Sequence, residues 1–301
     1  MILRTLFGET CESFLESHFL IAPFARPGGC RAYCRALGQD ELIRAFDGDN
    51  LDIVVGRDGQ PWHDAVPPKN LDEARNVLAH GGTLCVRHAE RHAPAIATLA
   101  DEFRRDLQAP VDVHLHWTPP MKSGFGWHYD AEDVFVLQIA GSKEWWLRKN
   151  TVNPWPLMEN LPNDMQYERE VMPAMRCLLG PGDVLYVPHG YWHRTMAGET
   201  SLSLSVGMKQ PTALDLLDFV RQRLSDSLRW RQRLPYCTDS GREGQQKWQA
   251  MRDGLGRDIA RALADPPTLA AFWPHWSASG APDMPRGSSD RQVQSLHVPP
   301  A

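Results

Sequence analysis

A run of short extended segments between residues 111 and 208 constrains the fold of this chain more than any other feature. Val111–Trp117 alternates apolar and polar residues, and Ser201–Val206 alternates serine with aliphatic residues. Alternate residues of a strand point to opposite faces, so each segment predicts a strand with one apolar face. Gly180–Asp183 has the composition of a turn and precedes the extended segment Val184–Val187. Many short strands separated by glycine and proline turns predict an all-β barrel or sandwich.

Two further extended segments lie in the middle of this region, at Val134–Ile139 and Glu144–Arg148. Ala140–Ser142 between them is turn-like, so the pattern predicts a hairpin. Lys143 begins the second segment and falls on the same side as Trp145, because residues two apart in a strand share a face.

Helical patterns flank the extended region. Before it, residues 70–80 and Ala95–Leu107 carry apolar positions at spacings of three and four, and Pro94 is suited to opening the second helix. After it, Thr212 and Asp215 can cap a helix, and a further helix is predicted over 243–264. The helix that follows Pro211 has an apolar stripe made of Leu214, Leu217, Val220, Leu224 and Leu228.

These patterns predict four parts. Residues 1–110 form a mixed α/β region that packs on the core, and residues 111–208 form the core itself. Residues 209–276 form a helical segment, and residues 277–301, rich in glycine, proline and serine, are expected to be disordered.

Composition narrows the class of protein. The formal net charge of −5 gives no general attraction to phosphate, so nucleic acid is not expected as a partner. The six cysteines form no CxxC pair, which favours reduced thiols over a disulfide framework or a zinc ribbon. The first twenty residues lack a continuous apolar core and a cleavage site, and no stretch has the length of a membrane helix. The sequence therefore predicts a cytoplasmic protein without a membrane segment.

A set of candidate metal ligands lies within the strand region. His128 and Asp130 are two residues apart, so on an extended chain their side chains point to the same face. His193 follows the strand Val184–Val187 where a barrel strand would turn at the rim, and His189 is a rival third ligand on chemistry alone. Two histidines and one carboxylate are the facial triad of non-haem iron oxygenases. By itself, a His-x-Asp pattern is also that of two surface polar residues at the end of a strand.

Lys143 is the second element of the candidate site. A lysine that faces the interior of a barrel is costly to desolvate unless an anion meets it, and a dicarboxylate cosubstrate supplies that anion. The alternative is a solvated lysine in a hairpin.

Six segments together resemble, in order and spacing, the core motifs and flanking strands of JmjC-type oxygenases. They are Leu115–Pro120, Gly126–Asp130, Val134–Gln138, Gly141–Lys143, Gly182–His193 and Ser205–Gly207. The greatest resemblance is to the ribosomal oxygenase group of cupin-like hydroxylases, and it is specific over residues 111–208. It implies a mainly β fold: a double-stranded β-helix (jelly-roll or cupin) core with flanking N-terminal helices and a C-terminal helical segment.

The resemblance also implies roles for individual residues. It implies Fe(II) ligation by His128, Asp130 and His193, because the third ligand of the family is the histidine three residues after the glycine. It implies a salt bridge from Lys143 to the distal carboxylate of 2-oxoglutarate. His114 stands where many ribosomal oxygenases have an asparagine near the cosubstrate.

Ser203 and Ser205 share a strand face and are candidates to line the cosubstrate pocket, the alternative being a solvated serine face. No segment long enough for the winged helix of ribosomal oxygenases is expected after the C-terminal helices.

The function that follows is an Fe(II)- and 2-oxoglutarate-dependent dioxygenase that hydroxylates a protein or peptide side chain and releases succinate and CO2. The alternatives are an N-methyl demethylase of the same family and a non-catalytic metal-binding cupin that acts as a sensor. A zinc hydrolase or isomerase with the same three ligands is a third class, which would not need Lys143. The apolar stripe after Pro211 predicts a homodimer through the C-terminal helices, unless it packs on the N-terminal helices.

Overall fold

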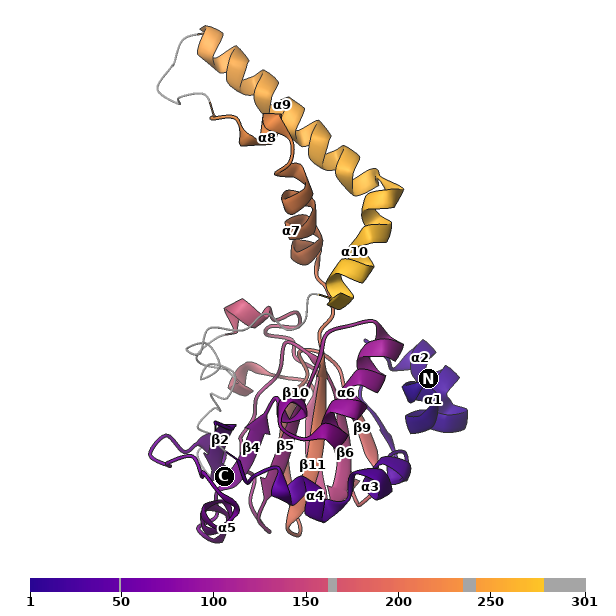
Figure 1. Ribbon diagram of the computed structural model, residues 1–301, viewed down its shortest axis with the longest axis vertical. Coiled ribbons are helices and arrows are strands. Elements are labelled where there is room, and N and C mark those ends of the chain that lie inside the picture. The colour runs from indigo at the N-terminus through magenta and orange to yellow at the C-terminus, as the bar shows by residue number, and fades with distance from the viewer. Residues whose placement is uncertain (49, 162–166, 235–241, 279–301) are drawn as a thin grey trace. The chain divides into compact units, whose positions relative to one another are not determined.

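The computed structural model describes residues 1–48, 50–161, 167–234 and 242–278. It has two compact units, one over Met1–Lys209 and one that begins at Gln210, and each is described separately. In the first unit, strands form two sheets and helices lie mainly in the N-terminal half (Figure 1). Its strands are β1 (Phe24–Arg26), β2 (Asp52–Arg57), β3 (Gln60–Pro61), β4 (Thr83–Arg87), β5 (Val111–Thr118), β6 (Asp133–Ala140), β7 (Lys143–Arg148), β8 (Met175–Leu179), β9 (Val184–Val187), β10 (Trp192–Ala197) and β11 (Ser201–Met208). Its α-helices are α1 (Ile2–Phe7), α2 (Cys11–Ser17), α3 (Arg31–Leu37), α4 (Gln39–Arg44), α5 (Leu71–Ala79) and α6 (Pro94–Leu107).

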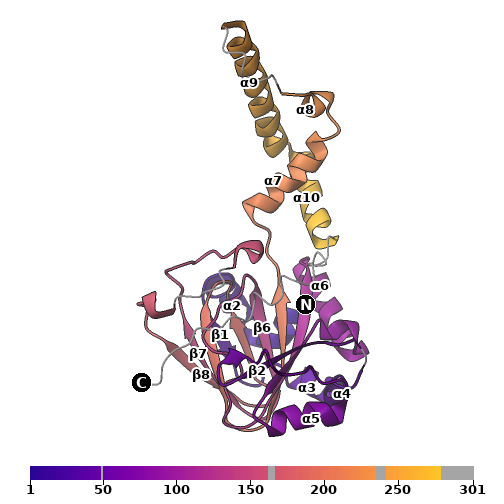
Figure 2. The ribbon, with the colours of Figure 1, turned by 90° about the vertical axis from the view of Figure 1, so that its left-hand side faces the viewer.

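The larger sheet has eight strands in the order β1-β9-β6-β11-β5-β4-β2-β3, and every pairing in it is antiparallel. The smaller sheet has the order β10-β7-β8. Helices α3 to α6 lie beside one face of the larger sheet, and β7 and β8 lie on its other side (Figure 2). The first hundred residues are thus part of the same unit as the later strands, because β1 to β4 extend the large sheet on both edges.

The predicted alternation determines which face of each central strand meets which layer. Val113 and Leu115 of β5 and Leu204 of β11 are buried in one cluster with helix residues such as Phe7 and Phe103. A second cluster lies between the two sheets and consists of Val136, Trp145, Leu147, Leu179, Leu185 and Val187. The polar face of β5 and β11 therefore points into the space between the sheets, and not to bulk solvent.

The predicted hairpin between the segments that became β6 and β7 is wrong. β6 pairs with β9 and β11, whereas β7 pairs with β8 and β10 in the other sheet. Gly141 has a φ of +63°, and a Cβ there would lie 2.1 Å from the carbonyl oxygen of Thr200. The chain thus makes a tight turn against the β10–β11 connection and crosses to the facing sheet. Sequence-adjacent strands in different sheets fit a double-stranded β-helix, in which the two sheets enclose a central space.

The second unit is helical, with α7 (Ala213–Leu224), α8 (Leu228–Arg231), α9 (Arg242–Ala264) and α10 (Pro266–Ala278). The predicted cap is confirmed: Thr212 and Asp215 form a capping box at the start of α7. The helix ends at Leu224, so Leu228 lies on α8. The Ser225 hydroxyl donates to the carbonyl of Gln222, the kind of local bond that competes with helix continuation.

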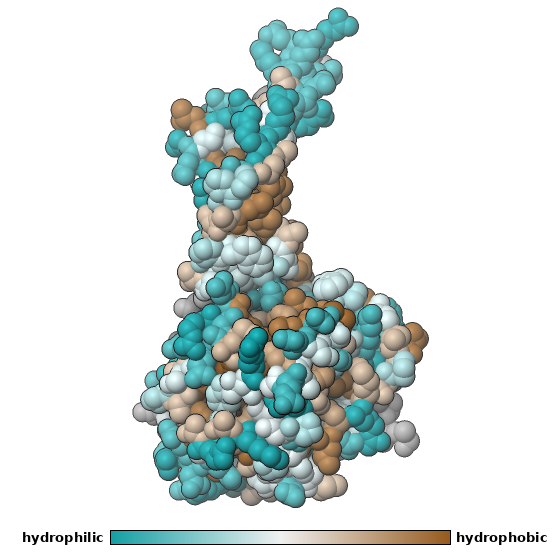
Figure 3. Space-filling model, turned by 90° about the vertical axis from the view of Figure 1, so that its right-hand side faces the viewer, coloured by the Kyte–Doolittle hydropathy of each residue, from teal (hydrophilic) through white to brown (hydrophobic). Residues whose placement is uncertain are grey.

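Inside this unit the ring of Phe219 packs 5.6 Å from that of Phe272. Leu214 and Leu217 of the apolar stripe are 50% and 45% exposed, whereas Val220 is buried. Figure 3 shows apolar residues in brown among the hydrophilic ones of these helices. The predicted disordered tail, beyond residue 278, lies outside the described residues.

Among the described helices, none combines the length and the apolar character needed to cross a bilayer.

Candidate active site

The structure brings His128, Asp130 and His193 together. One potential ligand atom from each lies within 4.8 Å of the others, and the Nε2 atom of His193 is 3.5 Å from the Oδ2 atom of Asp130. The backbone creates this proximity. His128 and His193 form an isolated antiparallel bridge, with N–O distances of 3.1 and 2.8 Å, and the amide of Gly190 donates to the carbonyl of Asp130. The segment before β6 is thus joined to the start of β10.

The two imidazoles are oriented by carbonyl groups two residues earlier in the chain. The Nδ1 atom of His128 is 2.8 Å from the oxygen of Gly126, and that of His193 is 3.0 Å from the oxygen of Tyr191. When Nδ1 carries the proton and donates to such a carbonyl, Nε2 has a free lone pair. Burial, together with His128, lowers the pKa of His193 to about 4, so this ring is neutral at pH 7. A neutral imidazole is the form that binds a metal.

His189, the rival ligand, lies outside this group. Its amide donates to the carboxylate of Asp133, its ring is 6.1 Å from that of Trp155, and burial lowers its pKa. Asp133 also accepts a hydrogen bond from the Tyr186 hydroxyl.

Lys143 lies at the other end of the same cavity. Lys143 is 4% exposed and alternates with half-buried residues on β7, as the period-two pattern predicted. Its Nζ atom donates to the Ser203 hydroxyl at 3.1 Å, and no carboxylate of the described chain lies within ion-pair distance of it. Burial lowers its pKa to about 8, because an ammonium group that has lost its water and has no anion is destabilised.

One wall of the cavity comes from β4, β5 and β11. Ser205 lies opposite His114 and Ser203 lies opposite His116 in the β5–β11 register, and Cys85 of β4 lies opposite His116 on the other side. All five residues line the cavity. Burial lowers the pKa of His114, and burial together with Lys143 places the pKa of His116 well below its usual range. Sequence reasoning named His114 and Ser205 and did not find Cys85 or His116.

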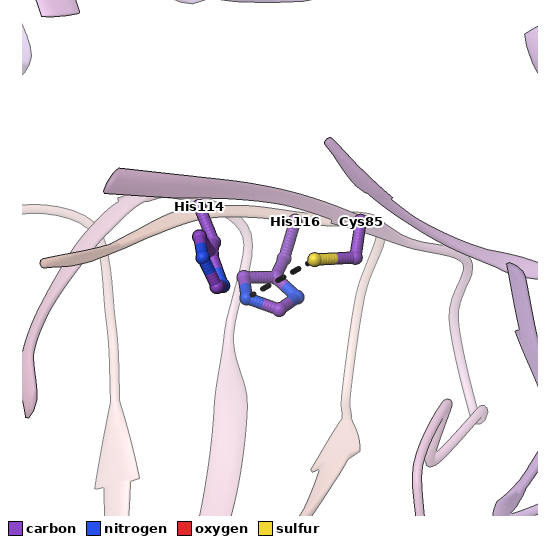
Figure 4. Close-up of side chains that lie close together, drawn as sticks. All are labelled: Cys85, His114 and His116. Atoms are coloured by element: carbon purple, nitrogen blue, oxygen red, sulfur yellow. Dashed lines mark hydrogen bonds between the residues drawn. The ribbon is translucent and has the colours of Figure 1, made fainter. Parts of the chain in front are cut away.

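The side chains of this wall approach one another closely. Figure 4 shows the rings of His114 and His116 side by side on β5, with the Cys85 thiol directed toward His116. The Sγ atom of Cys85 is 3.8 Å from the Nε2 atom of His116. One potential ligand atom from each of the three residues lies within 4.8 Å of the other two.

Two acidic residues that the sequence did not single out also line the cavity, near Asp130. Asp112 and Glu132 both lie within 4 Å of the Lys209 ammonium group, at 3.8 and 3.5 Å. Burial, with Asp112 adding repulsion, raises the pKa of Glu132 to about 8. Gly207 lies between the two carboxylates, and a Cβ there would come 2.4 Å from Glu132. Sequence alternation on β5 could have placed Asp112 beside His114, but Glu132 lies before a strand and has no such pattern.

Most of the tryptophans near the site belong to the core. Trp127, Trp145 and Trp192 are buried, and Trp146 is packed against the cluster that contains Trp127 and Trp192. The ring of Trp145 is 5.8 Å from that of His193, so it lies beside the proposed ligand.

The comparisons with known proteins agree with this geometry. Residues 88–216 match the protein family described as JmjC domain, and this range includes the three candidate ligands and Lys143. Over this range the chain is similar to JmjC-domain proteins.

Individual proteins are also similar to this chain over most of its length. The chain is 26% identical over 249 residues to the uncharacterized protein YxbC of Bacillus subtilis, which covers 74% of this chain and 75% of that protein. It is also 26% identical over 249 residues to the bifunctional lysine-specific demethylase and histidyl-hydroxylase NO66 of Drosophila persimilis. That match covers 75% of this chain and 35% of NO66, so the chain spans about a third of this relative.

Solved structures show the same fold. The ribosomal oxygenase YcfD of Escherichia coli superposes with a TM-score of 0.55 at 19% identity, over 90% of this chain and 71% of that chain. A second structure of YcfD, in complex with cobalt and 2-oxoglutarate, gives the same TM-score of 0.55 over 90% of this chain and 72% of that chain.

Proposed function

We propose that this protein is an Fe(II)- and 2-oxoglutarate-dependent dioxygenase that hydroxylates a side chain of a protein or peptide. One combination of observations carries the proposal. His128, Asp130 and His193 lie at one end of a cavity, and Lys143 is buried at its inner end, with no carboxylate of the described residues within ion-pair distance. A keto acid needs a metal for one end and a cation for the other, and this cavity has candidates for both.

The donor set fits the metal. Two neutral imidazoles and one carboxylate are the ligands that non-haem iron oxygenases use, and three protein ligands leave positions open for a cosubstrate. The carbonyl groups of Gly126 and Tyr191 orient the two rings in advance. Fe(II) bound there, with 2-oxoglutarate and dioxygen, would supply the oxidising power to hydroxylate a C–H bond, with release of succinate and CO2.

The inner end fits the cosubstrate. A distal carboxylate that enters between Lys143 and Ser203 would receive a charged hydrogen bond from the ammonium group and a neutral one from the hydroxyl. The negative charge of this carboxylate would also neutralise the buried ammonium group of Lys143. Ser205 and His114, one register position closer to the triad, are proposed to line the path of the keto acid, and the apolar cluster around Trp145 excludes water from it.

A second reaction, N-methyl demethylation, is supported by the name of one group of relatives. NO66 is described as both a lysine-specific demethylase and a histidyl-hydroxylase, so this group combines the two reactions. Both begin with hydroxylation of a C–H bond, and hydroxylation of an N-methyl group leads to its loss. The protein substrates of NO66 and of a ribosomal oxygenase favour a protein or peptide substrate here too.

The proposed location is the cytoplasm. The described cysteines, which are Cys11, Cys30, Cys34, Cys85 and Cys177, are all free thiols, as in a reducing compartment.

The test is turnover followed by identification of the product. Protein loaded with Fe(II) should form succinate from 2-oxoglutarate when oxygen is present, and the Asp130→Ala variant should not. Incubation with a cell extract should then add one oxygen atom in mass to specific peptides. Loss of a methyl group would establish the demethylase reaction instead. Absence of succinate formation with every extract, from protein shown to contain iron, would overturn the proposal and leave a binding protein.

A further inference from the structure

The cavity wall on β4 and β5 contains a second set of side chains that can serve as metal ligands. We propose that Cys85, His114 and His116 form a binding site for a thiophilic divalent metal such as Zn²⁺, and that a metal bound there excludes the keto acid from the cavity. The metal site itself is independent of the proposed function, whereas the exclusion of the keto acid rests on it.

The backbone holds the three side chains in place. His114 and His116 are two residues apart on β5 and so share a face, and Cys85 is the cross-strand partner of His116 in the β4–β5 register. Both strands have neighbours on each side in the eight-stranded sheet. Ligands on the central strands of a sheet are positioned more firmly than ligands on loops.

The distances suit a small metal ion. Bond lengths of about 2.3 Å to sulfur and 2.0–2.1 Å to nitrogen, at tetrahedral angles, require ligand atoms roughly 3.3–3.6 Å apart. The Cys85 and His116 atoms are 3.8 Å apart, and the whole group lies within 4.8 Å. In the triad, too, one potential ligand atom from each residue lies within 4.8 Å of the others, and the Nε2 atom of His193 is 3.5 Å from the Oδ2 atom of Asp130. Side-chain rotations that move the ligand atoms by less than a bond length would therefore bring either group around an ion.

The donor chemistry distinguishes the two groups. A thiolate with two imidazoles favours Zn²⁺, Co²⁺ or Cu²⁺, whereas a carboxylate with two imidazoles is the set of non-haem iron. Cys85 is 5% exposed, and its hydrogen-bond partner in the described structure is His116, so metal binding would replace a weak sulfur contact. Three protein ligands leave the fourth position of a tetrahedral ion for water or a small anion.

The second site and the keto acid would occupy the same space. Cys85 and His116 lie in the same cross-strand row as Ser203, and Ser203 accepts the hydrogen bond of Lys143. A metal ion beside this row adds positive charge near the Lys143 ammonium group, which opposes its binding. Removal of the lysine charge should therefore strengthen the metal site while it weakens the proposed keto-acid site.

Cobalt provides a test that needs no turnover. Co²⁺ bound to a thiolate gives a near-ultraviolet charge-transfer band, which the triad cannot give because it contains no sulfur. Wild-type protein titrated with Co²⁺ in reducing buffer should show this band, and Cys85→Ser should lack it. The control is Cys177→Ser on β8, since Cys177 is a half-buried free cysteine that does not line the cavity, and this variant should retain the band. Thermal unfolding of each variant reports whether the fold is intact. His116→Ala should also lack the band, although it keeps the Cys85 thiol.

Addition of 2-oxoglutarate should then abolish the band in wild-type protein. In Lys143→Ala the band should form and should persist when 2-oxoglutarate is added. Absence of the band in folded wild-type protein, or its survival in Cys85→Ser, would overturn the second site. A band that 2-oxoglutarate leaves unchanged would overturn the exclusion. If the proposed function fails instead, the cobalt band still forms but no succinate is made, so the two failures are distinct.

Discussion

The two ends of the cavity are built in different ways. At the triad end, His128 and Asp130 come from one short segment, and a backbone bridge joins this segment to His193. At the inner end, Cys85 and His116 are 31 residues apart and meet through the β4–β5 register. Lys143 and Ser203 are 60 residues apart and lie in different sheets, so the packing of one sheet on the other brings them together.

The charges at the two ends differ as well. The triad end has carboxyl and imidazole groups, with Asp112 and Glu132 close to Asp130. The inner end has a buried ammonium group with a hydroxyl as its partner. A molecule that is bound by both ends must offer metal-chelating oxygens at one end and an anion at the other, which describes a keto dicarboxylate. Substitutions at the triad, at Lys143 and at Ser203 each alter one end, whereas Leu217→Arg alters the helical unit and neither end.

Substitution of a triad residue should have the largest effect. His193→Ala leaves two ligands, which cannot hold Fe(II) in a fixed geometry. Succinate formation should therefore fall by more than about 100-fold, which exceeds the loss typical when a residue that only supports a metal ligand is replaced. His189→Ala is the matched control, because this histidine is half-buried and close by but lies outside the group. It should keep most of the activity. The opposite pattern would assign the third ligand to His189.

Lys143→Ala should weaken 2-oxoglutarate binding with little change in iron binding. Loss of a buried charge pair costs a few kcal/mol, which corresponds to roughly a 100-fold weaker Kd. Ser203→Ala removes a neutral hydrogen bond at the same place and should cost about tenfold or less. Calorimetric titration with 2-oxoglutarate measures both variants, and equal affinity of Lys143→Ala and wild type would remove the lysine from the site.

The pH dependence of 2-oxoglutarate binding should come from the same end. The pKa of Lys143 without ligand is about 8, so the ammonium group is present below this pH and is lost as the pH rises through it. The affinity should therefore fall above about pH 8, by as much as roughly tenfold per pH unit. Lys143→Ala should show no such fall over this range. A wild-type affinity that stays constant up to about pH 9.5 would show that the charge of this lysine does not control binding.

The helical unit should affect the cavity least. Leu217 is 45% exposed on α7, and we predict that it belongs to a homodimer contact that an arginine would break. Light scattering should show a dimer of wild-type protein at tens of micromolar and a monomer of Leu217→Arg, with turnover changed less than about twofold since the cavity lies in the other unit. Leu178→Arg, at an exposed position on β8, is the control and should remain dimeric. A monomeric wild type would refute the dimer.

The difference between the two ends also explains what the sequence could predict. The alternation in Val111–Trp117 and Ser201–Val206 predicted strands whose apolar faces are buried, because period and burial are local properties. His128 and Asp130 could be recognised as a pair because two residues on one extended segment share a face. Lys143 was predictable for the same reason, from its place on the face of Trp145.

The pairing of distant segments could not be predicted in this way. Nothing in the sequence places Cys85 opposite His116, since that depends on which strands become neighbours and on their register. The hairpin prediction failed for the same reason: a turn at Gly141 is compatible with strands that pair and with strands in facing sheets. The carboxyl group of Glu132 lies before a strand and has no periodic signal.

One measurement tests both ends of the cavity together. Under anaerobic conditions, Fe(II) that is held by the triad and chelated by 2-oxoglutarate gives a visible charge-transfer band. The account predicts that this band appears when wild-type protein is titrated with both, and that it is absent in Asp130→Ala. The account also predicts that Lys143→Ala forms the band only at a far higher 2-oxoglutarate concentration. Absence of the band in folded wild-type protein, or a band with the same strength and midpoint in all three proteins, would contradict the assignment of the cavity to iron and a keto acid.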